Sequence, residues 1–279
     1  MKKKGKKSTL ILLVIFFVGL SVMLYPAIAD YWNSKTQSEA IIDYEQILMN
    51  MPKEDYSDVF KEANQYNEKL TKLDMPLLEY NKVDGYFDIL NVNGVGMMGY
   101  IIIDKIGVEL PIYHTTDEAV LNVAVGHLQG SSFPVGGKST HAVLSAHRGL
   151  PSSTLFTHLD HLEIGDQFQF KILDETITYE IDQILIVNPD ETKELAIVEG
   201  EEYTTLVTCT PYGINTHRLL VRGVKVDSFK TKKLYITSDA YRIDSLIVTP
   251  VVALPMIVTL MLVVLLQPVK KDVIGDDVL

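Results

Sequence analysis

The sequence predicts a mainly β protein, either a closed barrel or a sandwich of short strands, with an apolar segment at each end. Two observations lead to this fold class. From Met98 onward, short strand-like runs alternate with turn residues, and helical stretches are brief. On each side of that region lies an uncharged run that is long enough to cross a bilayer as a helix.

The N-terminal apolar run covers Ser8 to Ala29, 22 residues without a charge. Five lysines precede it, and they place residues 1–7 in the cytoplasm by the positive-inside rule. We therefore interpret 8–29 as a transmembrane helix. The alternative is a cleaved signal peptide, because Ala27-Ile28-Ala29 resembles an A-x-A cleavage site. Under either interpretation, the chain that follows is exported.

The second apolar run, 245–269, is also predicted to be a transmembrane helix, since Pro250 and Pro255 are tolerated in lipid. Lysines follow it, so residues 270–279 are expected in the cytoplasm. Residues 30–243 would then lie outside the cell. They carry 18 Lys and Arg against 32 Asp and Glu, a net charge of about −14, which argues against binding nucleic acid.

Residues 30–93 are expected to form a helical stalk and a lid-like loop. Apolar residues recur at helical spacing between Ile41 and Leu48, and a second helix is predicted from Lys53 to Leu73. No clean period follows from Leu73 to Asn93, and this loop either lies over a site or simply connects two elements.

Residues 94–243 are predicted to form the catalytic β domain. Short helices are expected at 117–122 and from Ser152 to Phe156. Strands are expected at 99–104, 107–113, 141–147, 167–173, 177–187, 203–210 and 217–223.

Two of these strands end in groups that could cooperate chemically, His147 and Cys209. Cys209 is the only cysteine in the sequence, so it is either a small buried hydrophobe or a reactive thiol. A neighbouring histidine can pair with the thiolate and later protonate a leaving amine. Arg218, on the next strand, is the candidate for stabilising a developing oxyanion.

At these residues the chain resembles the sortases. The resemblance rests on Ser145-Ala146-His147-Arg148-Gly149, on Thr205-Leu206-Val207-Thr208-Cys209-Thr210-Pro211 and on the strand that begins His217-Arg218. The combination of the cysteine signature, the earlier histidine and the later arginine is specific, whereas each alone would be weak. Leu90-Asn91-Val92-Asn93 and the C-terminal apolar segment resemble class C, the pilus-assembling sortases.

The resemblance implies a closed eight-stranded β-barrel on the outer face of a Gram-positive cell membrane, with His147, Cys209 and Arg218 as the catalytic residues. It implies cleavage of an LPXTG-like sorting signal through a thioacyl intermediate, and isopeptide joining of pilin subunits to a pilin lysine. No cofactor or metal is expected. The alternatives are a housekeeping sortase that anchors surface proteins to cell-wall peptidoglycan, and a non-catalytic membrane scaffold.

Further candidates depend on position within these motifs. Thr208 and Arg222 are candidate substrate contacts, and Arg222 shares a strand face with Arg218. Many class C enzymes carry an Asp-Pro-aromatic lid, but here Leu73-Asp74-Met75-Pro76 has no aromatic residue after the proline. We therefore expect an open site with an accessible Cys209. His127, in an apolar run, is expected to be a buried core residue.

Overall fold

The computed structural model describes residues 3–227, 255 and 257–259. It divides into two units, which we describe separately: the apolar N-terminal part up to Ala27, and the chain from Ile28 through the β domain. The predicted C-terminal transmembrane helix lies outside the described residues, apart from 255 and 257–259.

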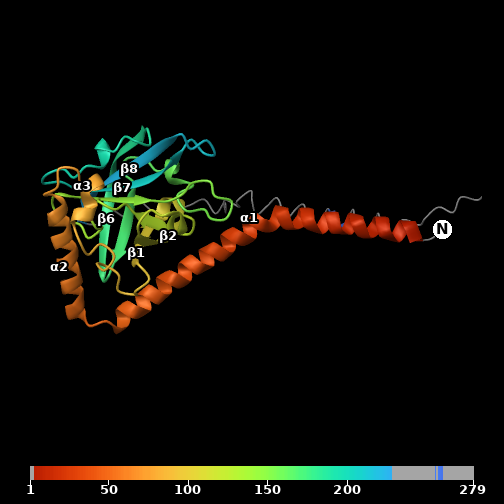
Figure 1. Cartoon of the computed structure of the whole chain (residues 1–279), viewed down its shortest axis with the longest axis horizontal. Helices are drawn as coiled ribbons and strands as arrows, with labels where there is room; N and C mark the ends of the chain where they lie inside the picture. Colours follow the sequence, from red (N-terminus) through yellow and green to blue (C-terminus); the bar gives the residue numbers. More distant parts are fainter. Residues whose placement is uncertain (1–2, 228–254, 256, 260–279) are drawn as a thin grey trace, which may run out of the picture. The chain divides into compact units, whose positions relative to one another are not determined.

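The β domain is a closed barrel of eight strands in the order β1-β2-β3-β4-β7-β8-β6-β5, and β1 pairs with β5 to close it (Figure 1). This confirms the predicted closed barrel over the sandwich. The strands are β1 (Met97–Ile103), β2 (Val108–His114), β3 (Val125–His127), β4 (Thr140–Ser145), β5 (Gln167–Ile172), β6 (Glu175–Val187), β7 (Glu202–Thr210) and β8 (His217–Val226).

Two strand pairs in the barrel are parallel, β2 with β3 and β4 with β7, and the remaining pairs are antiparallel. The β4–β7 pair matters most for the site. The chain leaves β4, forms the β5–β6 hairpin and returns to lie beside β4 in the same direction. A parallel pair needs such a long crossover, and here it brings the carboxyl ends of two distant strands together.

Aromatic side chains fill the barrel interior. Phe168, Phe170 and Tyr179 are almost fully buried, and the Phe168 and Tyr179 rings stack with centroids 5.5 Å apart. Gly223 on β8 passes so close that a Cβ there would lie 2.9 Å from Phe168 and Tyr179 atoms. A side chain at position 223 would therefore displace the largest residues of the core.

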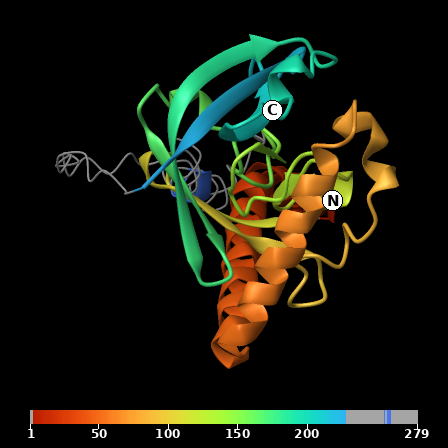
Figure 2. The ribbon, with the colours of Figure 1, turned by 90° about the vertical axis from the view of Figure 1, so that its left-hand side faces the viewer.

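Helical residues that follow Ile28 pack on the barrel. α1 (Lys3–Asn50) is one helix that runs through Pro26, and α2 (Lys53–Leu70) follows it (Figures 1 and 2). Sequence analysis expected separate helices for the apolar run and the stalk, but no break separates them. Tyr44 of α1 is fully buried; its hydroxyl donates to the Met98 carbonyl (3.1 Å) and accepts from the Leu173 amide (2.9 Å).

The short helices differ in part from expectation. The expected helix at 117–122 is present as α4 (Glu118–Leu121). The helix that was expected to open at Ser152 to Phe156 is absent, because this segment forms turns and an isolated bridge at Ser153 and is followed by the 3₁₀ turn η3 (Leu159–His161). The other short elements are α3 (Pro76–Glu79), η1 (Tyr80–Lys82), η2 (Asp104–Ile106) and η4 (Lys193–Leu195).

His127 is a satisfied core residue, as expected. It is fully buried, its Nδ1 lies 3.0 Å from the Tyr86 hydroxyl, and its Nε2 lies 2.8 Å from the Ser132 carbonyl. Burial lowers the pKa of His127 to about 4. Desolvation also lowers the pKa of His114 and of His141.

Acidification is therefore expected to destabilise the fold. Between pH 6.5 and 4 the unfolded chain binds a proton at residue 127 that the folded chain does not, so stability falls as the pH falls. From the pKa of about 4, His127 alone accounts for a loss of about 2 kcal/mol between pH 8 and pH 5. Urea unfolding of the detergent-solubilised chain at both pH values measures it.

The matched variant is His127→Gln, which cannot titrate. It should show a smaller loss of unfolding free energy between pH 8 and pH 5 than the unmodified chain, whatever its stability at pH 8. An equal loss in the two proteins would show that His127 does not contribute to the acid sensitivity.

Candidate functional site

Cys209 and Arg218 form a cross-strand pair at one end of the barrel. In the antiparallel ladder of β7 and β8, Cys209 lies directly opposite Arg218. Residues in such positions have Cα atoms about 5 Å apart and side chains on the same face of the sheet. Both residues are half-buried on one face at this end of the barrel, and Arg218 Nη1 donates to the His217 carbonyl (3.1 Å) and the Asn215 carbonyl (3.4 Å).

His147 reaches the same area from β4. Because β4 runs parallel to β7, the chain directly after β4 lies level with the end of β7. The Ala146 amide donates to the Val207 carbonyl (3.2 Å), and the Thr208 hydroxyl donates to the Ala146 carbonyl (2.8 Å). Since His147 is the next residue, the structure brings it level with Cys209. All three residues of the predicted trio thus lie at neighbouring ends of β4, β7 and β8.

Cys209 and Arg218 lie on the outer face of the barrel. A small apolar cluster occupies that face, and we call it the outer cluster. Cys209 is two residues from Val207, and Arg218 is two residues from Leu220, so each shares a face with a member of this cluster. The outer cluster consists of Val143, Leu195 and Leu220, with Leu77, Leu128, Leu185, Val187 and Val207 packed against it.

A cavity of about 590 Å³ adjoins the outer cluster. Residues 71–78 form one wall, and residues of the β6–β7 connection between 192 and 199 form another. Leu77 and Leu195 belong to both the cavity and the outer cluster. No member of the trio lines the cavity, so the cavity is a neighbouring depression and does not itself contain the candidate nucleophile.

The helix α3 of the lid-like segment contacts the outer cluster through one leucine. Leu77, in α3, packs against the outer cluster, whereas Met75 is 55% exposed and Leu78 is 74% exposed. Gly130 makes close docking possible, because a Cβ there would lie 2.5 Å from the Pro76 carbonyl oxygen and 2.7 Å from the Leu77 Cα. Sequence analysis considered the missing aromatic residue, and the structure has an aliphatic contact at this place.

Because α3 contacts the outer cluster through Leu77 alone, it should close the site only weakly. Deleting residues 74–84 is expected to raise the alkylation rate of Cys209 by less than tenfold, which corresponds to less than about 1.4 kcal/mol of opening free energy. The measurement is the second-order rate with a small alkylating agent. Cys209 is the only cysteine, so no other thiol contributes to the signal.

Point variants control for damage caused by the deletion. Leu77→Ala should reproduce most of the change, while Leu78→Ala, at an exposed position in the same helix, should change nothing. A hundredfold acceleration in the deletion variant or in Leu77→Ala would show that the segment is a true lid.

The two candidate substrate contacts lie elsewhere. Thr208 is 1% exposed and its hydroxyl is used by the Ala146 carbonyl. Arg222 lies opposite Thr205, four residues and roughly 13 Å along β8 from Arg218. Its guanidinium donates twice to the Asp182 carboxylate (3.1 and 2.6 Å) and stacks on Tyr203, 4.2 Å from the ring centroid. The polar groups of both residues thus have partners within the chain, and their contact with substrate stays a prediction.

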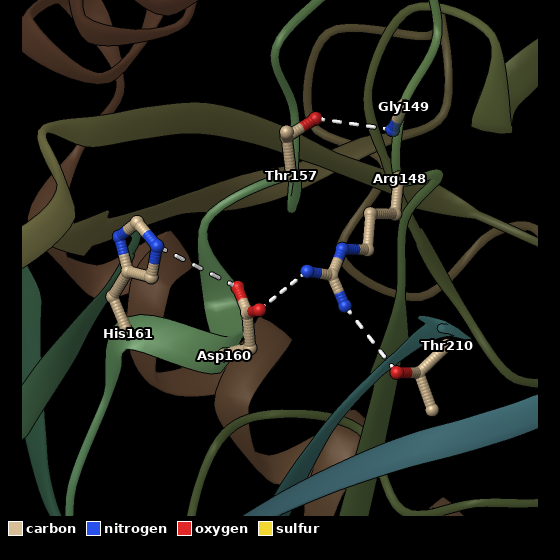
Figure 3. A network of polar contacts seen from close by, with 6 residues as sticks. All are labelled: Arg148, Gly149, Thr157, Asp160, His161 and Thr210. Atoms are coloured by element: carbon tan, nitrogen blue, oxygen red, sulfur yellow. Dashed lines mark hydrogen bonds and ion pairs between the residues drawn. The ribbon is translucent and has the colours of Figure 1, made fainter. Parts of the chain in front are cut away.

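Sequence analysis did not identify the partners of Arg148. Its side chain is only 8% exposed and forms an ion pair with Asp160 of η3, and it also donates to the Thr210 hydroxyl (3.4 Å; Figure 3). The guanidinium lies 5.8 Å from the centroid of the Tyr212 ring. The sequence offered one indication of this contact: Arg148 directly follows the candidate histidine. A guanidinium that is buried there requires an acidic partner.

The histidines, acids and the cysteine of the described residues do not gather into one cluster. Within them, no group of three or more His, Cys, Asp or Glu side chains is placed to hold an ion. His158 and His161 stack on each other, with ring centroids 5.1 Å apart.

Comparison with known proteins identifies relatives of the β domain. A family model described as the sortase domain matches residues 101–226. Sortase D of Bacillus subtilis (strain 168) is 34% identical over 131 residues, which are 46% of this chain and 63% of that protein. The alignment thus spans less than two thirds of that relative.

Solved structures show the same likeness over a longer stretch. Sortase C1 from Streptococcus agalactiae is 49% identical, with a TM-score of 0.64, over 68% of this chain and all of that one. Clostridium perfringens sortase C, solved with a C-terminal cell wall sorting motif, is 41% identical, with a TM-score of 0.59, over 68% of this chain and 100% of that one. Streptococcus pneumoniae sortase C is 37% identical, with a TM-score of 0.60, over 68% and 97%.

Proposed function

The chain belongs to the sortase family, whose members are cysteine transpeptidases, and we propose that it cleaves an LPXTG-like sorting signal and transfers the product to an amine. The observation that carries this proposal is the cross-strand pairing of Cys209 with Arg218 beside the end of β4, where His147 follows. A nucleophile, a proton carrier and a cation that can stabilise an oxyanion together suffice for acyl transfer.

In the proposed reaction, the Cys209 thiolate attacks the carbonyl carbon of the Thr–Gly peptide bond. The oxyanion that forms is stabilised by Arg218, whose planar fork of donors remains charged at all relevant pH values. Collapse of this intermediate breaks the C–N bond, and His147 gives a proton to the departing glycine amine. The products of this half are a thioacyl enzyme and the released C-terminal peptide.

The second half reverses these roles. An acceptor amine attacks the thioester carbonyl, His147 takes a proton from that amine, and the C–S bond breaks to regenerate the thiolate. We propose that the acceptor is a lysine of another pilin subunit, which yields an isopeptide-linked polymer. The support is the likeness to several sortase C structures, one of which was solved with a sorting motif.

The test mixes the detergent-solubilised chain with two purified pilin forms, one with an intact sorting signal and one whose candidate acceptor lysine is replaced by arginine. The intact pilin should give a ladder of covalent polymers, and the arginine form should stop at hydrolysed monomer. Transfer to a peptidoglycan-precursor amine without any ladder would indicate a housekeeping sortase. Absence of every covalent product, with an unreactive Cys209, would indicate a non-catalytic scaffold.

We further propose that residues 8–29 anchor the enzyme in a Gram-positive cell membrane, with the catalytic domain outside and both ends of the chain in the cytoplasm. In support, the described residues include one helix, Leu10–Asn50, that is long and apolar enough to cross a bilayer. Tyr31 and Trp32 follow the apolar run and are 70% and 67% exposed. Aromatic side chains in such positions are typical of a membrane–water interface.

Trp32 is the only tryptophan in the sequence, so its fluorescence reports on this anchor. In vesicles we expect its emission to be quenched several-fold more by lipids brominated near the headgroup than by lipids brominated near the chain end. A chain cleaved after Ala29 would leave Trp32 in water and unquenched, which would support the signal-peptide alternative. Trp32→Phe supplies the background signal.

A further inference from the structure

The side chain of Arg148 links the residues that directly follow two members of the proposed catalytic trio. Arg148 comes directly after His147, and Thr210 comes directly after Cys209. An Arg148 Nη1 donates to the Thr210 hydroxyl at 3.4 Å, and Thr210 is 7% exposed (Figure 3). One side chain thus bridges the ends of β4 and β7.

This bridge begins where the backbone ladder stops. The last backbone hydrogen bond between these two strands joins the Ala146 amide to the Val207 carbonyl. Beyond that bond, the Thr208 hydroxyl donates to the Ala146 carbonyl (2.8 Å), and side chains take over from the backbone ladder in fixing the distance between His147 and Cys209. Proton transfer requires heavy atoms within about 3 Å, so this distance has to be set by other contacts.

Asp160 fixes the orientation of the arginine. Arg148 Nη2 pairs with one carboxylate oxygen of Asp160, and the other oxygen lies 4.0 Å from His161 Nε2 (Figure 3). The side chain of Arg148 is 8% exposed and that of Asp160 is 40% exposed, so Arg148 is the more deeply buried partner of the ion pair. A charge in this position is stable only while its partner remains in place.

The backbone after Arg148 is held as well. The Gly149 amide donates to the Thr157 hydroxyl (3.1 Å), and the Phe156 amide donates to the His147 carbonyl (3.1 Å). Gly149 has φ +75°, and a Cβ there would lie 3.0 Å from the Tyr212 ring. The turn after His147 is therefore fixed at its backbone, and Arg148 connects this fixed turn to β7.

We propose that Arg148, oriented by Asp160, is a positioning residue that holds His147 level with Cys209. In this role Arg148 contacts neither the thiol nor the substrate. It acts through its hydrogen bond to Thr210 and through its peptide bond to His147. The proposal rests on the catalytic roles proposed above for His147 and Cys209.

The test is a double-mutant cycle of Arg148→Met and Thr210→Val in the full chain. Arg148→Met is expected to lower kcat for a sorting-signal peptide by 10- to 100-fold with KM changed less than threefold. Thr210→Val should give a smaller loss, and the double variant should be no slower than Arg148→Met. Arg148→Lys keeps the charge but has one nitrogen in place of the fork, so it should restore little of the rate.

A second readout needs no substrate. The pH dependence of Cys209 alkylation reports how strongly the thiolate pairs with His147, and in Arg148→Met it should move towards higher pH. Arg148→Lys should move the alkylation profile similarly, because this variant keeps the positive charge and loses the positioning of His147. Since this readout is independent of transpeptidation, it distinguishes failure of this inference from failure of the proposed function.

Lys225→Met provides the control. Lys225 forms an ion pair with Glu202 (3.4 Å), and both residues lie at the end of the β7–β8 pair that is far from Cys209 and Arg218. It should leave kcat and the alkylation profile unchanged, and thermal unfolding verifies the fold of every variant. Independent losses that multiply in the double variant would overturn the proposal. So would a full rescue by lysine, or an unchanged alkylation profile in a folded Arg148→Met.

Discussion

Replacing Cys209 with alanine is expected to abolish the covalent intermediate completely. The chain has no second thiol, and the proposed thioacyl bond can form only at this sulfur. Mass spectrometry of the enzyme after incubation with a sorting-signal peptide should show an adduct in the unmodified chain and none in Cys209→Ala. Polymer formation should disappear with it.

Loss of folding is a weak explanation for such a result. Cys209 is half-buried at the end of a strand, so removing its sulfur should destabilise the barrel by about 1 kcal/mol or less. Cys209→Ser tests the chemistry more finely, since a hydroxyl of similar size is a far weaker nucleophile at neutral pH and should reduce the rate at least a thousandfold. A covalent adduct in Cys209→Ala would place the nucleophile elsewhere.

Replacing His147 with alanine is expected to lower kcat/KM by roughly three orders of magnitude or more. The loss combines two effects: the thiolate loses its imidazolium partner, and the leaving amine loses its proton donor. The register of β4 with β7 supports this, because it puts His147 level with Cys209. Initial rates of peptide cleavage measure the effect.

His158→Ala is the matched control for this prediction. His158 lies in the same connection between β4 and β5, but its side chain is exposed and stacks on His161. Its replacement should change kcat/KM less than threefold. A His147→Ala variant that keeps more than a tenth of the activity would remove His147 from the proposed mechanism, and equal losses in the two variants would point to damage of the segment.

The candidate trio could be predicted from the sequence because its signals are local. A run of apolar residues indicates a buried strand, and a proline or glycine indicates where that strand ends. A reactive side chain at the end of such a run is therefore easy to identify. The strand parity of Arg218 with Arg222 could be derived in the same way. Parity, however, gives the face and not the partner, so the pairing of Arg222 with Asp182 appeared only in the fold.

The sequence by itself determined seven of the eight strands, the apolar N-terminal helix and the candidate reactive residues, because each depends on periodicity or composition within a few residues; the three-residue strand β3 was not expected. The tertiary structure alone decided the barrel closure, the parallel register of β4 with β7, the docking of Leu77 and the pairing of Arg148 with Asp160. These features join residues that are distant in the chain, and their free energy comes from burial and pairing in three dimensions, which no local pattern encodes.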